Sequence, residues 1–491
     1  MEEELNKQFF ALINETINIY DLMALCFMYV WEYDSEEQSW EVNDETAEII
    51  DGIMGTYLCF AENMGIKKAM NILKINLKEQ LFNKFSFEYS LAIIYWIDDN
   101  IESDLGFSGL EENRSYVYSS LNKCNTDKIK IVPTIYAKSL VGKFAEQKEG
   151  ESEYTVLRKF EKTTFAYLSD NVNNYIIWDY SLLSRYDFDI VRLDPCTNSF
   201  IKRMKENKKI NIAIYPTTKE SLDKYFDMEY KGRSFYIKGV KDDTVEDELK
   251  ERYKKIMEEY KGKSQKADFI VFPEMLMTAC IRNEVFNEHQ YDGVLVCGSV
   301  WKDRKNVSSV LDRNKNEIFH YEKKNPFIKE LEKREYKEGI ERENIPKKYS
   351  VMEIEGVGRI GVCICKDLMD DGVFQFHSIM ETTILLVPMY SQSLELQRDA
   401  KSYSMKRQGI VVAANSCSAM DDTNNSRDIG FVSLPAKKNN TNEFFIHKYD
   451  NKSCIKDCKS SCCGKYVELD FNDIEIINNT KTIRTRVRDF K

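Results

Sequence analysis

The segment GRIGVCICKDLMDDG, residues 358–372, decides both the fold and the candidate chemistry of this chain. Its apolar run passes into an acidic stretch, which is typical of a buried strand that ends at an exposed turn. Side chains alternate along a strand, so Cys363 and Cys365 lie on the same side of it. Periodicity therefore leaves open which of the two cysteines is a nucleophile.

Position along the predicted strand favours Cys365. Cys363 lies between apolar neighbours inside the strand, where burial keeps a thiol neutral and a poor nucleophile. Cys365 ends the strand, so the backbone N–H of Lys366 is free to face an oxyanion, and Asp367 can fix the turn. We therefore expect Cys365 to be the nucleophile and Lys366 to contact the substrate.

The sequence around this segment alternates short apolar strands with amphipathic helices, from about residue 206 to the end. This alternation predicts an α/β layered sheet. The expected strands include INIAIYP, ADFIVFPE, YDGVLVCGSVW, ETTILLVPMY and GIVVAANSC, and the expected helices include residues 247–262 and 396–408. Because exposed loops follow rigid strands, catalytic side chains are expected where these strands end.

The first part of the chain has a different pattern. Residues 9–31, 45–65 and 66–82 show helical periodicity with few breakers. We expect two domains, a mainly helical one over 1–205 with no assigned role and an α/β one over 206–491. The basic stretch from Lys202 to Lys209 is interpreted as a solvated linker at this boundary.

Composition narrows the function classes. The chain has 491 residues, a net charge of −11, 13 cysteines and four histidines. The acidic charge argues against general binding to nucleic acid or anionic membranes. The amino terminus lacks the order of a signal peptide, and the longest apolar run, residues 22–31, is too short to span a bilayer. Reduced thiols in a cytoplasmic enzyme fit the scattered cysteines better than disulfides do.

Three polar residues stand at the ends of predicted strands. Glu274 follows IVFP, Lys323 follows the hairpin strand IFHYEK, and Cys365 follows RIGVCI. A carboxylate can take the proton of a thiol, the thiolate can attack a carbonyl or nitrile carbon, and an ammonium group can stabilise the resulting oxyanion. The three groups together suffice for amide or nitrile chemistry without a histidine.

The segments VFPE, YEKKNPF and GVCICKD resemble, in this order, the three signature segments of the nitrilase or carbon–nitrogen hydrolase superfamily. The resemblance covers about residues 208–475. It implies an αββα sandwich with Glu274 as general base, Lys323 as the oxyanion-stabilising lysine and Cys365 as nucleophile. Tyr390, at the end of a predicted strand, is expected with Lys366 to contact the substrate.

Other features of the sequence are less direct guides. LEKREYKEG, residues 331–339, resembles the family segment whose glutamate supports the lysine, which places that role on Glu332; a charged helix face is the alternative.

The sequence also departs from the family pattern. The interval from Glu274 to Lys323 is compact, with little room for a helix before YDGVLVCGSVW. Ser404 and Lys406 stand where the family usually has alanine and glutamate, so family-type dimerisation does not follow directly.

A cysteine cluster lies near the carboxyl end, at Cys454, Cys458, Cys462 and Cys463. Four thiolates can complete a zinc tetrahedron, but adjacent cysteines ligate poorly together and CxxC knuckles are missing. An insertion with reduced, exposed thiols is the favoured interpretation. No metal and no cofactor are predicted.

The sequence therefore predicts a cytoplasmic, thiol-dependent hydrolase of a non-peptide carbon–nitrogen bond, with a linear amide favoured over a nitrile or acyl transfer to an amine. The alternative is a nitrilase-fold sensing or assembly module, as in some bacterial defence proteins, whose output the helical half delivers. Expected partners are a small-molecule amide, a second copy of the chain and a protein bound through the amino-terminal half.

Overall fold

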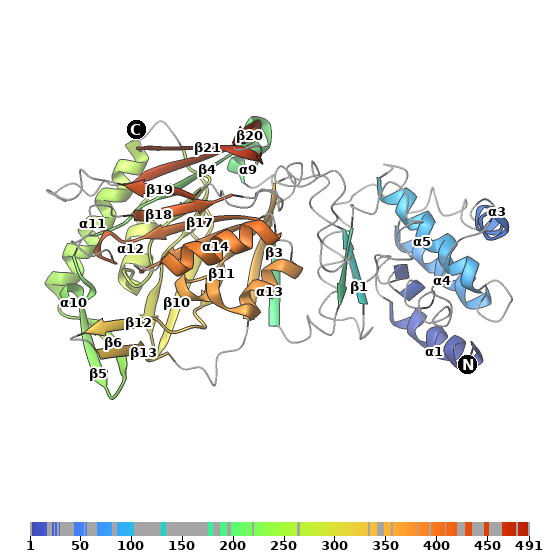
Figure 1. The fold of residues 1–491 in the computed structure, drawn as a ribbon, viewed down its shortest axis with the longest axis horizontal. Coiled ribbons are helices and arrows are strands. Elements are labelled where there is room, and N and C mark those ends of the chain that lie inside the picture. Colours follow the sequence, from blue (N-terminus) through green and yellow to red (C-terminus); the bar gives the residue numbers. More distant parts are fainter. Residues whose placement is uncertain are drawn as a thin grey trace. The chain divides into compact units, whose positions relative to one another are not determined.

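The structure is a computed structural model of the chain (Figure 1). It describes residues 2–16, 22–23, 25–26, 29, 44–53, 55, 66–80, 86–102, 129–133, 175–179, 187–193, 198–218, 220–262, 266–331, 334–340, 348–354, 357–380, 382–391, 394–407, 409–419, 428–434, 446–450, 464–477 and 480–489. These residues form two compact units, one within Met1–Arg185 and the other within Tyr186–Lys491.

The first unit is mainly helical in its described part, as the periodicity predicts. Its helices bury residues at spacings of three and four, for example Ala69, Leu73 and Leu77 on one face of α4. A short antiparallel pair of strands accompanies them. The elements are α1 (Glu2–Glu15), α3 (Asp44–Ile53), α4 (Ile66–Gln80), α5 (Ser86–Glu102), β1 (Ile129–Pro133) and β2 (Tyr175–Asp179).

The second unit contains a large sheet of eight described strands. β4, β7 and β8 are parallel and short, and all side chains of β7 and β8 are apolar and buried, which is the pattern of strands covered on both faces. The strand order is β11 (Glu317–Glu322), β10 (Lys305–Leu311), β8 (Val294–Val296), β7 (Phe269–Val271), β4 (Lys209–Ile214), β20 (Lys465–Ile477) and β21 (Thr480–Asp489), with β9 (Val300–Lys302) paired to β10.

A second large sheet has seven described strands. β15, β16 and β17 are parallel at its centre, and all described side chains of β16 and β17 are buried. The strand order is β19 (Ile446–Asp450), β18 (Asp428–Ser433), β17 (Ile410–Asn415), β16 (Thr382–Met389), β15 (Gly358–Val362), β14 (Lys348–Ile354) and β3 (Asp187–Leu193).

The two sheets face each other and helices cover their outer sides, so the unit is the αββα sandwich that the resemblance implied (Figure 1). β7 contacts β16, and the backbone N–H of Glu274 donates to the carbonyl of Met389 across the sheets at 3.3 Å. α11 (Asp243–Gly262) and α12 (Ala279–Glu288) pack on the first sheet, and α13 (Asp371–Ile379) and α14 (Leu394–Arg407) pack on the second.

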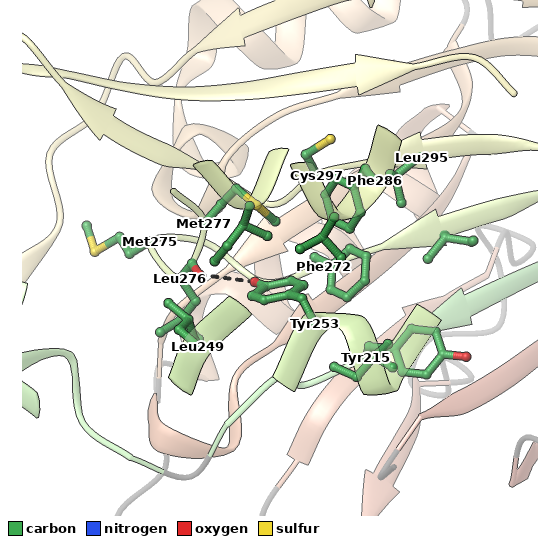
Figure 2. Close-up of a cluster of buried hydrophobic side chains, with 14 of the residues drawn as sticks. Tyr215, Leu249, Tyr253, Phe272, Met275, Leu276, Met277, Phe286, Leu295 and Cys297 are labelled. Atoms are coloured by element: carbon green, nitrogen blue, oxygen red, sulfur yellow. Dashed lines mark hydrogen bonds between the residues drawn. The ribbon is translucent and has the colours of Figure 1, made fainter. Parts of the chain in front are cut away.

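The apolar core under α11 holds the segment before the site in place. Figure 2 shows Leu249 and Tyr253 of α11 in one cluster with Phe272 and Met275, which follow β7, and with Leu295 of β8. The Tyr253 hydroxyl donates to the carbonyl of Leu276 at 3.1 Å, so its one polar atom is satisfied inside the core. The strand end that carries Glu274 is therefore packed rigidly.

A smaller sheet of four described strands lies beside the sandwich. Its order is β12 (Ile328–Leu331), β13 (Arg334–Glu338), β6 (Ser234–Val240) and β5 (Phe226–Lys231), and the four-residue helix α10 (Leu222–Tyr225) leads into β5. β13 pairs in parallel with β6 through Glu338 and Phe235. The charged segment 334–338 is therefore a strand, and the helix-face interpretation was wrong for it.

The structure differs from the sequence expectations near residue 205. β3 pairs in parallel with β14, and α9 (Ser199–Asn207) is a helix rather than a solvated linker. Arg203 of α9 forms ion pairs with Asp268 and Asp292, which explains why a basic stretch belongs to a folded element. The second unit thus begins upstream of the expected boundary.

Two further observations concern the helix α12 and the length and polarity of the described helices. The compact interval after Glu274 does hold a helix, α12, whose first turn is capped by the Thr278 side chain. Among the helices described, none is long and apolar enough to cross a membrane.

Candidate active site

Glu274 is placed where the segment after β7 passes close to the segment after β8. It follows β7 by three residues, and the next residue, Met275, has a left-handed φ of 65°. Gly298 also has a positive φ, of 74°, and a Cβ there would lie 2.2 Å from the Pro273 carbonyl. Only glycine allows this close approach. The close approach fixes the backbone from which the Glu274 side chain extends.

Lys323 follows β11, and its amine meets two carboxylates. The Lys323 backbone N–H donates to the carbonyl of Asn306 at 2.8 Å. Its Nζ donates to Oε1 of Glu274 at 2.5 Å and to Oε2 of Glu338 at 2.7 Å. All three side chains are fully buried. A buried ammonium between two carboxylates requires such geometry to compensate for lost hydration.

Cys365 lies just beyond β15, which ends at Val362. Cys363 and Ile364 lead from the strand, and Cys365 begins a 3-10 helix, η5 (Cys365–Met369). Cys365 has a left-handed φ of 48°, which is costly for a residue with a side chain and is found where function demands it. Its sulfur is close to the Glu274 carboxylate and to the backbone N–H of Tyr390.

The structure thus brings together Glu274, Lys323 and Cys365, the three residues singled out from strand ends. Glu332, the fourth, lies outside the described residues, and so does the cysteine cluster at 454–463. A second carboxylate is supplied by Glu338, at the end of β13. Among the described residues, no group of histidine, cysteine or acidic side chains could hold a metal ion.

Glu338 and Glu274 differ in how many of their oxygens are occupied. Glu338 accepts from Lys323 and from the backbone N–H of Phe327 on Oε2, and from Asn306 and Trp301 on Oε1. Both oxygens of this carboxylate therefore accept two hydrogen bonds each.

Glu274 accepts its two nitrogen donors, Lys323 and Asn306, on one oxygen, Oε1. Its Oε2 is buried and accepts no hydrogen bond from the described nitrogen and hydroxyl donors. The Cys365 thiol also interacts with this carboxylate. Glu274 therefore has one oxygen without a hydrogen bond from the described nitrogen and hydroxyl donors, whereas both oxygens of Glu338 accept such bonds.

Burial governs the protonation of this cluster. It raises the pKa of Glu274 to about 7, against the opposing charge of Lys323. Burial also raises the pKa of Cys365 well above its usual value, helped by the Glu274 charge and opposed by Lys323. For Lys323, burial alone would lower the pKa, but the charges of Glu274 and Glu338 outweigh it and raise the pKa.

Asp367 lies in η5 just after Cys365, and its carboxylate fixes the turn after Lys323. Its buried carboxylate accepts the backbone N–H groups of Lys324 and Asn325, the latter at 2.6 Å. Burial raises the pKa of Asp367 to about 6, against Lys323 and these two N–H groups. One side chain therefore ties the lysine segment to the cysteine segment.

The two expected substrate contacts have different surroundings. Lys366 is partly exposed at the start of η5. Tyr390 is buried, its hydroxyl donates to the carbonyl of Ser418 at 3.2 Å, and its ring meets Phe327 edge to face at 6.3 Å. The Lys323 amine lies 5.9 Å from the centre of the Phe327 ring. Aromatic side chains thus form a wall beside the catalytic groups.

Glu338, Asn306 and Trp301 were missed by sequence reasoning. Glu338 lies in a run of charges where strand and helix patterns compete. A strand period would have grouped it with Tyr336, and both are more buried than their neighbours. One feature of the sequence could have pointed to Asn306. It is a polar residue near the start of β10, the strand that pairs with β11, and Lys323 directly follows β11.

Comparison with known proteins gives structural similarity only. No protein-family model matches the chain, and no curated protein matches it. Among solved structures, it is similar to Saccharomyces cerevisiae Nit3, a member of branch 10 of the nitrilase superfamily, with 14% identity, a TM-score of 0.35, and coverage of 53% of this chain and 90% of that one.

Two further structures have comparable values. An amidase from Nesterenkonia sp. has 12% identity and a TM-score of 0.29, with coverage of 46% of this chain and 82% of the amidase. The glutamine-dependent NAD+ synthetase from Acinetobacter baumannii has 15% identity and a TM-score of 0.34, with coverage of 58% and 49%. The chain spans about half of that synthetase. At these identities the likeness concerns the fold.

Proposed function

We propose that the second unit is a thiol-dependent carbon–nitrogen hydrolase that cleaves a linear amide through a thioester on Cys365. The observation that supports it most is the unequal use of the two buried glutamates. Both oxygens of Glu338 accept hydrogen bonds, whereas Oε2 of the buried Glu274 accepts none from the described donors, and the Glu274 carboxylate interacts with the Cys365 thiol. A base with one open oxygen, a thiol and a fixed ammonium are the parts that acyl transfer requires.

In the first half of the reaction, Glu274 accepts the proton of the Cys365 thiol and the sulfur attacks the amide carbonyl carbon. The carbonyl oxygen becomes an oxyanion that meets the Lys323 ammonium and the backbone N–H of Lys366. The C–N bond then breaks, and the leaving nitrogen takes the proton held by Glu274. Ammonia or an amine leaves, and the acyl group stays on the sulfur.

In the second half, water attacks the thioester carbon while Glu274 accepts a proton from it. The C–S bond breaks, the proton returns to the sulfur, and a carboxylic acid is released. Lys323 can stabilise both oxyanions because two of its three N–H groups are directed at Glu274 and Glu338, which leaves one for the substrate.

Mass spectrometry of the intact protein tests this proposal without a known substrate. The full-length chain is incubated with a panel of small primary amides and with cell extract, quenched in acid, and digested for peptide mapping. We expect an acyl adduct on Cys365 that disappears in Cys365→Ala.

Cys363→Ala is the matched control, because Cys363 is equally buried two residues away. It should keep the adduct. An adduct on Cys363 instead, or iodoacetamide labelling of Cys363 with Cys365 left untouched in folded protein, would overturn the assignment of the nucleophile.

A further inference from the structure

We infer that Asn306 is a positioning residue that directs Glu274 toward the thiol, by bridging the two glutamates with the two hydrogens of its side-chain amide. This inference rests on the proposed function, since it assigns the orientation of the base in that reaction. Asn306 is fully buried on β10. Its Nδ2 lies 3.0 Å from Oε1 of Glu274 and 3.0 Å from Oε1 of Glu338.

The bridge matches the chemistry of an amide group. An NH₂ group has two hydrogens, and here each carboxylate receives one. The reverse orientation of the amide would place Oδ1 against two carboxylate oxygens, so electrostatic repulsion selects the observed one. In that orientation Oδ1 is buried with no hydrogen-bond partner among the described residues. Leaving an acceptor unsatisfied is costly, which indicates that the two donated bonds dominate the placement.

The backbone of Asn306 also positions the third member of the cluster. Its carbonyl accepts the backbone N–H of Lys323 at 2.8 Å. One residue thus holds Lys323 through its main chain and both glutamates through its side chain. Because Asn306 and Lys323 both donate to Oε1 of Glu274, the carboxylate is held in a rotation that leaves Oε2 without a donor among the described residues.

The charged and titratable groups around Glu274 come from several elements. Lys323 follows β11, Glu338 ends β13, and Cys365 and Asp367 belong to η5. Asn306 is the neutral member of this group. It stabilises the anion of Glu274 without adding a charge that Lys323 would have to balance.

The test follows the pH dependence of Cys365 alkylation by iodoacetamide in the full-length chain. In this reaction the sulfur forms a bond to carbon, iodide leaves, and Glu274 takes the thiol proton. Asn306→Asp keeps the shape of the side chain and removes the donors. We expect the pH of half-maximal rate to rise by about one unit, because Glu274 loses a hydrogen bond to its anionic form and gains a like charge.

Two comparison variants separate positioning from general damage. Trp301→Phe removes a donor to Glu338 only, so its midpoint should move less than that of Asn306→Asp. Thr383→Val removes a buried hydrogen bond to the Arg359 carbonyl, on a part of β16 remote from Met389, and should leave the midpoint unchanged. Thermal unfolding of each variant gives its stability.

The outcomes decide between the two proposals. Normal wild-type alkylation with an unmoved midpoint in Asn306→Asp, or an equal shift in Trp301→Phe, would overturn the role of Asn306 and leave the hydrolase proposal standing. No alkylation of wild-type Cys365 would count against the hydrolase itself. If Asn306→Asp does not fold, Asn306→Ser is measured in its place. Failure of both to fold while Thr383→Val folds would make Asn306 structural and overturn the inference.

Discussion

Two clusters in the second unit each hold a cation between two carboxylates, one partly exposed and one fully buried, and they differ in which carboxylate oxygens accept hydrogen bonds. At the amino-terminal side of the sandwich, Arg203 lies between Asp268 and Asp292. At the candidate active site, Lys323 lies between Glu274 and Glu338. The first cluster joins a helix to the sheet, and the second joins three strand ends.

The oxygens of Asp268 are all engaged. Oδ1 accepts from two nitrogens of Arg203, at 3.2 and 2.6 Å, and Oδ2 accepts the Asn211 backbone N–H at 2.7 Å. Glu274 has a comparable pKa of about 7, raised by burial as for Asp268, yet its Oε2 is open. A raised pKa is therefore no guide to function by itself. What distinguishes the candidate active site from the Arg203 cluster is a carboxylate with one oxygen that accepts no hydrogen bond from the described donors and with a thiol as a neighbour.

Among the substitutions that test the difference between the two clusters, Cys365→Ala is expected to have the largest effect on activity. Turnover and thioester formation should fall by on the order of 10³ or more, since one member of a concerted unit is lost. The stability loss should be only about 1 kcal/mol, because one buried sulfur is deleted. The adduct mass and a thermal melt measure the two quantities, and retained turnover would contradict the assignment.

Arg203→Met should do the opposite, destabilising the fold and sparing the chemistry. It leaves the fully buried Asp268 without its cation, which costs about 3 kcal/mol of unfolding free energy. The folded-state pKa of Asp268 is raised above its ordinary value, so stability from this group falls as pH rises, and the loss should be larger at pH 8 than at pH 6. Urea unfolding at both pH values measures it.

Lys202→Met is the matched control for this change. Lys202 is the next residue on α9, its side chain is 75% exposed, and it pairs only with the exposed Glu206. We expect no measurable loss of stability. If both variants unfold equally easily, the Arg203 cluster does not have the structural role assigned to it, and reduced Cys365 alkylation in folded Arg203→Met would link the two clusters.

The alkylation rate of Cys365 is expected to depend on pH through Glu274. This effect should be smaller than those of the substitutions above. Because the pKa of Glu274 is raised to about 7, the base is protonated below that pH and ionised above it. The alkylation rate of Cys365 should thus fall roughly tenfold per pH unit below about pH 7. Glu274→Gln should lose this dependence. A wild-type profile that is flat from pH 5 to 7 would exclude Glu274 as the base.

The smallest effect is expected for Cys363→Ala. Cys363 is fully buried, and burial raises the pKa of its thiol well above the usual value. Deleting one buried sulfur should cost about 1 kcal/mol of stability and leave the chemistry in place. Chemical denaturation and the adduct assay check the two parts. A large loss of adduct would show that the two cysteines act together.

That Glu274, Lys323 and Cys365 come together could be predicted because each follows a strand whose pattern is readable in the sequence. Glu338 could not, since its role depends on pairing between β13 and β6, about a hundred residues apart in sequence. β3 was missed for a related reason: its polar edge residues are only partly buried, so its strand pattern is weak. The contacts of Asn306 could not be predicted either, because they form only when three strand ends come together in the folded chain.

The bond between the Glu274 N–H and the Met389 carbonyl joins the two sheets at the proposed base. The candidate active site is therefore divided between two layers, with Glu274 and Lys323 on one and Cys365 on the other. A slip of one sheet against the other would separate base from thiol while every strand kept its own ladder of hydrogen bonds. The reactivity of Cys365 should thus report how the two sheets pack against each other. It should detect a displacement of the sheets that leaves the circular dichroism spectrum unchanged.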